Sequence, residues 1–295
     1  LLPASEKNRI LKMDVRDHLN KIDPRLRITR CASDLHEHGA VVLPVMTGCA
    51  AKRWNLTLSK AFDTFPEYKR QAGLNGLHVQ RTLGGFGAYA NPSSFHHTDI
   101  RKLRRHLKAY FMSICDAYVR LKWARNRSEA ESIRLEALFD RICVRHKSFG
   151  SVSPESWHRD IYDGKSHGLR TLPRTLPSTV PGLERERDII TGGWINLSSD
   201  NQYFSGIVGS HETPDAHRAQ RMSEVSGAGF AQLTDAQIAE QDVGGQLKSQ
   251  ANRTYGNTLR TDAKGRIVVR PGEQLVFFQR MLHSVAPQKN DSFNL

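Results

Sequence analysis

The sequence predicts a mainly β core supported by helices, with the strands concentrated in residues 148–295 and the helices in residues 1–147. Short β-prone runs punctuated by turn residues occupy 192–197 and 202–211, and another apolar run occupies 275–278. The first half instead carries longer stretches with apolar residues at helical spacing. A chain of 295 residues can bury one large core, so we expect a single domain.

The first half is expected to place several helices around one early strand. Charged and aliphatic residues at near-helical spacing predict a surface helix within 5–30, which Pro24 interrupts. A short helix from about Ser33 ends at Gly39, and a buried strand follows over 40–45. Further helices are expected over 49–65, 99–122 and 129–141.

His158 and Asp160 are separated by one residue in a segment that we expect to be a strand. Residues i and i+2 of a strand project from the same face, so both side chains can point inward while Arg159 points away. Two imidazoles and one carboxylate on one face of a metal form the facial triad of non-haem iron sites. The third ligand has to come from a distant strand that folds back beside the first.

His97 and Asp99 have the same spacing, but the apolar residues that follow them recur at helical intervals. We therefore expect Thr98 or Asp99 to cap a helix. This context argues against metal binding by His97 and Asp99.

Four motifs occur in one order through residues 148–295. They are Trp157-His158-x-Asp160, Gly193-Trp194-x-x-Leu197, the turn Gly209-Ser210-His211, and Pro271-Gly272-Glu273 leading through an apolar strand to His283-Ser284-x-x-Pro287. In this order the chain resembles the phytanoyl-CoA dioxygenase-like branch of the Fe(II)/2-oxoglutarate-dependent oxygenases. Residues 34–45 are also similar to the opening helix, glycine and first strand of that family.

The resemblance implies a double-stranded β-helix, a jelly roll of two sheets with the metal-binding strands close together at one open end. It implies that His158, Asp160 and His283 bind Fe(II), and that 2-oxoglutarate is the cosubstrate of a hydroxylation. Asp160 favours hydroxylation over halogenation, because halogenases of the family lack a carboxylate at that position. Trp194 matches the family position that packs beside the cosubstrate.

One departure from the family pattern concerns the cation that binds the far carboxylate of 2-oxoglutarate, which is an Arg beyond the distal His in the family. After His283 this chain has Lys289 but no Arg before Leu295. Either the Arg follows Leu295, or Lys289 or another cation replaces it, or cosubstrate binding has been lost.

This departure leaves two alternatives to a 2-oxoglutarate oxygenase. The chain could be a non-catalytic jelly-roll protein that retains the ligand pattern for structure or binding, or a cupin-like metal enzyme that does not use 2-oxoglutarate. The substrate of an oxygenase stays open among small molecules, protein side chains, lipids and nucleobases.

Three segments are predicted to be loops or insertions near the site. Glycines within 83–95 allow close backbone approach and fit neither a phosphate loop nor a dinucleotide fingerprint, so this segment is expected to be an ordinary loop or, as the sharper hypothesis, part of the wall of the site. The prolines of residues 163–188 predict a functional lid or a disordered segment, and their position directly after the iron-binding strand favours a substrate lid. Residues 211–255 form a polar insertion, partly helical over 234–240.

The chain is strongly basic, with 43 Lys and Arg against 30 Asp and Glu and a net charge of +13. Such a balance raises the chance of a polyanionic partner, namely nucleic acid, a membrane surface or an acidic substrate, but a solvated basic surface is the commoner cause of such a charge. Arg101, Arg104, Arg105 and Lys108 fall opposite the apolar stripe of the helix predicted over 99–122.

The sequence has no apolar run of about 18 residues, so we expect no membrane span. Charged residues follow the first four at once, unlike a signal peptide. The four cysteines lie far apart without a Cys-x-x-Cys pair, which favours reduced, buried thiols in an intracellular protein of the cytoplasm or nucleus. The chain does not begin with Met and stops shortly after His283, so we expect a fragment.

Overall fold

The computed structural model describes residues 24–64, 87–88, 97–123, 128, 143–144, 155–160, 191–213, 216 and 230–285. Several sequence predictions lie wholly or mostly outside these residues. They are the surface helix before Pro24, the glycine-rich loop over 83–95, the helix over 129–141, the segment 163–188, and Lys289.

Five α-helices are described, and the two longest follow the sequence predictions. The helices expected over 49–65 and 99–122 are confirmed as α4 and α8, and the expected helical part of the 211–255 insertion is confirmed as α11. The bounds are α3 Pro24–His38, α4 Gly48–Thr64, α8 Thr98–Trp123, α11 Asp235–Glu240 and α12 Val243–Ser249.

The ends of α3 and α8 differ in detail from the prediction. Pro24 begins α3, well before the start predicted near Ser33, and proline suits this position because its missing N–H is no loss in the first turn. Gly39 ends α3 with φ of 78°, and its N–H donates to the Leu35 carbonyl at 3.0 Å. At the start of α8, the Asp99 N–H donates to His97 Nδ1 at 3.3 Å, so His97 occupies the capping position predicted for Thr98 or Asp99.

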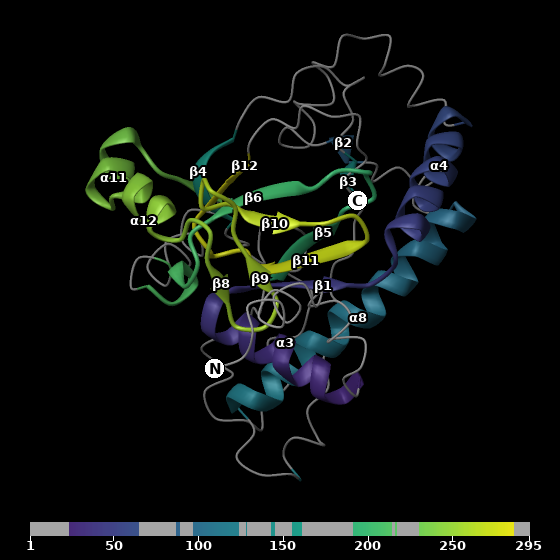
Figure 1. The fold of residues 1–295 in the computed structure, drawn as a ribbon, viewed down its shortest axis with the longest axis horizontal. Helices are drawn as coiled ribbons and strands as arrows, with labels where there is room; N and C mark the ends of the chain where they lie inside the picture. The colour runs from purple at the N-terminus through teal and green to yellow at the C-terminus, as the bar shows by residue number, and fades with distance from the viewer. Residues whose placement is uncertain are drawn as a thin grey trace, which may run out of the picture.

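The strands form two main antiparallel sheets and two short ribbons (Figure 1). The three-stranded sheet has the order β1-β11-β5, and the five-stranded sheet has the order β10-β6-β12-β4-β7. Their bounds are β1 Ala40–Pro44, β4 Glu155–Asp160, β5 Thr191–Ile195, β6 Gln202–Gly206, β7 Phe230–Gln232, β10 Ile267–Val269, β11 Glu273–Phe278 and β12 His283–Val285. The ribbons pair β2 Gly87–Ala88 with β3 Cys143–Val144, and β8 Thr254–Tyr255 with β9 Leu259–Arg260.

The central strand β11 is buried along its whole length because it packs on both faces. Val276 and Phe278 join a core with residues of α3 and α8, whereas Leu275 and Phe277 join a second core with Phe204 of β6 and with residues of β10. This period-two alternation places the three-stranded sheet between the helices and the five-stranded sheet. Figure 1 shows α3 and α8 running along the outer side of β1.

The predicted combination of helices with antiparallel sheet is confirmed, but the description as mainly β is not. Within the described part of the chain, helical residues outnumber strand residues, since α8 alone has 26 residues while no strand exceeds six. None of the described helices is both long and apolar enough to cross a membrane.

Two of the predicted buried thiols are buried, and a third is not. Cys31 and Cys115 are free, and burial raises the pKa of Cys31 to about 12 and that of Cys115 to about 11. Cys49 is free but exposed, because it lies in the first turn of α4 on the side away from Ala51 and the core.

The Gly39 turn yields a stability prediction with a matched control. A Cβ at Gly39 would lie 2.4 Å from His211 Nδ1, whereas one at Gly209, which also has a positive φ of 82°, would meet nothing within 4 Å. Gly209→Ala should therefore cost about 1–2 kcal/mol of backbone strain. Gly39→Ala should cost about 1–3 kcal/mol more, because His211 must also move. Urea unfolding of both variants measures the difference, and equal losses would contradict it.

Candidate metal centre

The two strands that carry the candidate ligands are neighbours in the five-stranded sheet. His283 of β12 lies directly opposite His158 of β4 in the antiparallel register, and on its other side it lies opposite Gly206 of β6. His158 in turn lies opposite Gln232 of β7. The pairing therefore brings together residues that are more than a hundred positions apart in the sequence.

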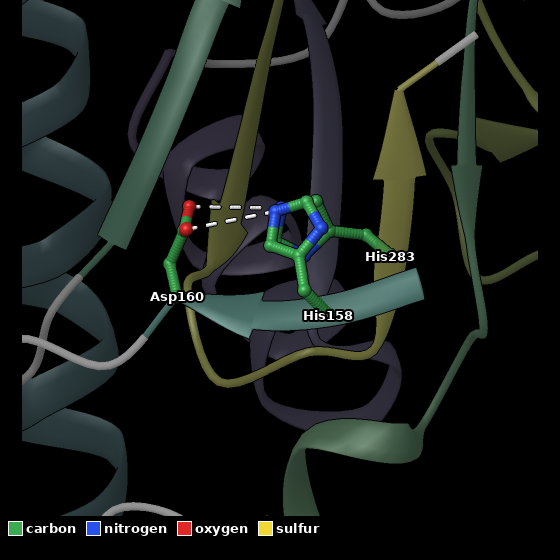
Figure 2. A group of neighbouring side chains, drawn as sticks. All are labelled: His158, Asp160 and His283. Atoms are coloured by element: carbon green, nitrogen blue, oxygen red, sulfur yellow. Dashed lines mark ion pairs between the residues drawn. The ribbon is translucent and has the colours of Figure 1, made fainter. Parts of the chain in front are cut away.

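His158, Asp160 and His283 converge on one point (Figure 2). The Asp160 carboxylate oxygens lie 3.6 Å from Nε2 of His158 and 3.6 Å from Nε2 of His283, and the two imidazole centroids are 4.3 Å apart. These N···O separations exceed a normal hydrogen bond, so they suit an ion between the groups better than direct pairing.

The spacing fits a metal ion. One ligand atom from each residue lies within 4.8 Å of the other two, so a common point exists no more than about 2.8 Å from all three. Metal–nitrogen and metal–oxygen distances in such sites are about 2.0–2.2 Å. Side-chain rotations that move the ligand atoms by under about 1 Å would therefore complete the coordination. The donor set of two imidazoles and a carboxylate suits a divalent transition metal.

His283 is held in the tautomer that metal binding requires. Its Nδ1 lies 2.8 Å from the Met281 carbonyl oxygen, and because a carbonyl only accepts, Nδ1 must carry the proton. Neutral His283 then keeps a lone pair on Nε2, the atom that faces Asp160. A hydrogen bond of this kind orients metal-ligating histidines in proteins.

The site is enclosed on the histidine side and open on the aspartate side. The His283 ring packs 5.1 Å from Phe277 and 5.4 Å from Phe204, and the side chains of His283 and His158 are 3% and 9% exposed. The Asp160 side chain is 33% exposed. Of the three ligands, Asp160 is therefore the one in substantial contact with solvent.

The residues beside the ligands on β4 point to the opposite face of the sheet. Trp157 packs against a cluster that includes residues of α11 and α12. Arg159 is buried and donates to the carbonyl oxygen of Ser210 at 2.9 Å and to that of Arg280 at 2.5 Å. The alternation predicted for His158 and Asp160 thus matches the environment of all four residues.

The other predicted site residues lie outside this group. Trp194 of β5 packs edge-on against Phe204 and Phe277, which both contact His283, and its Nε1 donates to Gln202 Oε1 at 2.9 Å. Lys289 lies beyond the described residues. His97 lies at the start of α8, with its ring nitrogen on the Asp99 amide.

Sequence reasoning missed the residues that surround the ligands. Phe277 carried a usable signal, because strand periodicity places it on one face with Leu275, whereas Phe204 shares its face of β6 with Gln202 and Gly206 and carried a weaker one. The role of the Met281 carbonyl could not be predicted, because a backbone acceptor is independent of the side chain. The role of Arg159 could not be predicted either, because an arginine between two ligands resembles an ordinary surface residue.

His211, from the Gly-Ser-His turn, makes contacts that indicate a structural role. Its ring is stacked on Phe278 with centroids 5.1 Å apart, and its Nε2 lies 3.0 Å from the His36 carbonyl. Burial lowers the pKa of His211 to about 4. The residue is therefore neutral when folded at physiological pH, and it joins the η4 turn, Ser210–Glu212, to α3.

Fold and site together define a helix-supported, two-sheet protein with a two-histidine, one-carboxylate constellation on its five-stranded sheet. No model of a known protein family matches the chain, and a search of curated proteins finds no significant match.

The geometry predicts that the chain binds one divalent metal through these three residues. His158→Ala with Asp160→Ala should abolish binding of Co(II) or Fe(II), because one imidazole alone cannot hold the ion. The matched control, His97→Ala with Asp99→Ala, removes the other His-x-Asp pair and should leave one bound metal per chain. The number of metal ions bound per chain is measured for both double variants by titration with the metal followed by elemental analysis. Loss of metal in the control would show that His97 and Asp99 form the site.

The His211 environment predicts a pH dependence of stability. Because its pKa is lower in the folded chain than the ordinary value of 6.5, the unfolded chain binds the extra proton as the pH falls, and stability is lost between about pH 6.5 and 4. From pH 7.5 to 5 this loss amounts to about 2 kcal/mol. His211→Phe should lose about that much less over the same interval in urea unfolding. Parallel pH profiles for the two proteins would contradict this assignment.

Proposed function

We propose that the chain is an Fe(II)- and 2-oxoglutarate-dependent dioxygenase that hydroxylates an as yet unidentified substrate. The observation that carries the proposal is the convergence of His158, Asp160 and His283 from two paired strands. Three ligands on one side of an ion leave the remaining positions for cosubstrate and oxygen. The order of motifs from Trp157 to Pro287, which resembles phytanoyl-CoA dioxygenase-like oxygenases, supports the same assignment.

The finer fold assignment, a double-stranded β-helix, belongs to this proposal. Two antiparallel sheets enclose a core between them, made by Phe204, Leu275 and Phe277 among others. The ligand-bearing strands β4 and β12 are adjacent within one sheet. Both features are those of a jelly roll, although the described strands do not close into a barrel.

Fe(II) would be held by His158, Asp160 and His283, and with 2-oxoglutarate it would supply the activation of molecular oxygen for hydroxylation of a C–H bond. The residues of the chain supply position and environment. The Met281 carbonyl keeps the Nδ1 proton on His283, so that Nε2 can donate its lone pair. Asp160 contributes the negative charge, which a neutral third ligand would not.

The aromatic side chains form an apolar wall beside the metal ligands. Phe204, Phe277 and Trp194 form a contiguous group of rings beside His283. Such a wall excludes water and lowers the local dielectric, which strengthens the electrostatic interactions of the site. Trp194, predicted to lie beside 2-oxoglutarate, belongs to this group and is fixed by its hydrogen bond to Gln202. The cation for the far carboxylate would be Lys289, another cation, or an Arg after Leu295.

The proposal predicts turnover of 2-oxoglutarate to succinate by the full chain with Fe(II), ascorbate and oxygen. The His158→Ala, Asp160→Ala double variant should release no more succinate than a protein-free mixture, because it lacks two of three ligands. The His97→Ala, Asp99→Ala variant should retain the activity. Succinate release is measured by mass spectrometry, and binding of 2-oxoglutarate by isothermal titration of the metal-loaded protein. Absence of both release and binding, with metal still bound, would reject the proposal.

That negative result would favour the second candidate, a jelly-roll module that binds a polyanion without catalysis, or a metal enzyme that uses another cosubstrate. One observation favours the module. Arg101, Arg105 and Lys108 are exposed at i, i+4 and i+7 of α8 and so form one basic stripe, beside which Arg104 is half-buried. A stripe of this kind fits the phosphates of a nucleic acid or another polyanion.

A further inference from the structure

We propose that Arg159 is a positioning residue of the metal centre, acting through the turn that carries the chain from β11 into His283. The inference rests on the proposed metal site and extends it to a residue that is not a ligand. Arg159 lies between His158 and Asp160, yet its side chain is on the other face of β4 and is only 3% exposed.

The guanidinium group joins three segments. Its Nη1 donates to the Ser210 carbonyl at 2.9 Å and to the Arg280 carbonyl at 2.5 Å, and its Nη2 donates to Thr213 Oγ1 at 3.3 Å. Charge-assisted hydrogen bonds to fixed acceptors are among the stronger interactions of this kind in proteins. Arg159 thereby ties β4 to the turn at residues 279–282 and to the segment 210–213.

The turn at residues 279–282 contacts two of the three ligand residues, Asp160 and His283. The Gln279 carbonyl accepts from the Asp160 N–H at 2.9 Å, and the Met281 carbonyl accepts from His283 Nδ1 at 2.8 Å. The Leu282 N–H donates to Ser210 Oγ at 2.9 Å. The Arg280 carbonyl, held by Arg159, lies between the two carbonyls that fix Asp160 and His283. Displacing Arg280 would therefore disturb both ligands.

The chemistry of the position favours arginine. A buried cation is costly unless its donors are satisfied, and the rigid planar fork of arginine presents several donors in fixed directions to acceptors on separate segments. A lysine at the same position keeps the charge but has one ammonium group on a flexible stem. Arg159→Lys therefore tests the geometry of the fork separately from the presence of a charge.

The experiment compares the full chain with its Arg159→Lys variant. In metal-free protein labelled with ¹⁵N-histidine, at a pH where the imidazoles are neutral, His283 should be a single Nδ1–H tautomer in the wild type and a mixture in the variant. His283→Gln assigns the signal. Affinity for Co(II) should fall about ten- to a hundredfold in Arg159→Lys, which is the usual effect of disturbing groups behind a metal ligand.

The control is Arg266→Lys, because Arg266, like Arg159, donates more than one hydrogen bond from its guanidinium group, but to the Asp262 carboxylate and from the loop before β10. It should leave both the His283 tautomer and the Co(II) affinity unchanged. Should Arg159→Lys fail to fold, Thr213→Val removes the hydroxyl that accepts from Nη2, together with its hydrogen bonds to the Ser210 carbonyl and the Ala216 N–H. It should weaken Co(II) binding about two- to tenfold.

The outcomes separate this inference from the proposed function. A folded Arg159→Lys variant with the wild-type tautomer and Co(II) affinity would overturn it, and so would wild-type values in Thr213→Val if Arg159→Lys does not fold. If the wild type binds no Co(II), the metal site is rejected, and the tautomer of His283 alone decides whether Arg159 positions that ring. If the Co(II) affinity changes as much in Arg266→Lys as in Arg159→Lys, the change comes from a general loss of stability, and the inference is overturned.

Discussion

The antiparallel register between β4 and β12 is the constraint on which the candidate site depends. His158 and His283 face each other across this pair, and a slip of one residue in either strand would send its ligand to the opposite face of the sheet. The register is fixed on both sides, because β12 also pairs with β6 and β4 also pairs with β7. On the outer face, Leu282 is buried in the cluster beneath α11 and α12 and Trp157 packs against it, partly buried, which penalises any slip that would expose them.

The site also depends on β11, although none of its side chains is a ligand. β11 is held by β1 and β5 and is buried on both faces, so the point where it ends is well defined. The turn that follows delivers three consecutive carbonyls, those of Gln279, Arg280 and Met281, to Asp160, Arg159 and His283. The aromatic contacts of Phe277 with His283 then connect the core between the sheets directly to the ligand.

The features that depend on residues close together in the sequence could be predicted from it. The long apolar stripes of α4 and α8 and the buried strand β1 were predictable, and strand periodicity alone placed His158 and Asp160 on one face. His283 came only from the resemblance to an oxygenase family, because the pairing of strands so far apart leaves no local signal. The start of α3 at Pro24 was missed because proline tolerates a first turn as well as it breaks an interior one. Arg159 was missed because burial of a charged side chain depends on the segments that fold over it.

The exposure of the three ligands bears on how the proposed reaction could be reached from solvent. Phe204 and Phe277 cover one side of His283, and the cluster around Trp157 packs on the opposite face of β4. The segment 163–188, predicted to be a substrate lid or a disordered segment, lies outside the described residues. Asp160 is the most exposed ligand and the last residue of β4, whereas both imidazoles are almost fully buried. Under the proposed function, cosubstrate and substrate would therefore reach the metal from the side of Asp160 and not past the two histidines.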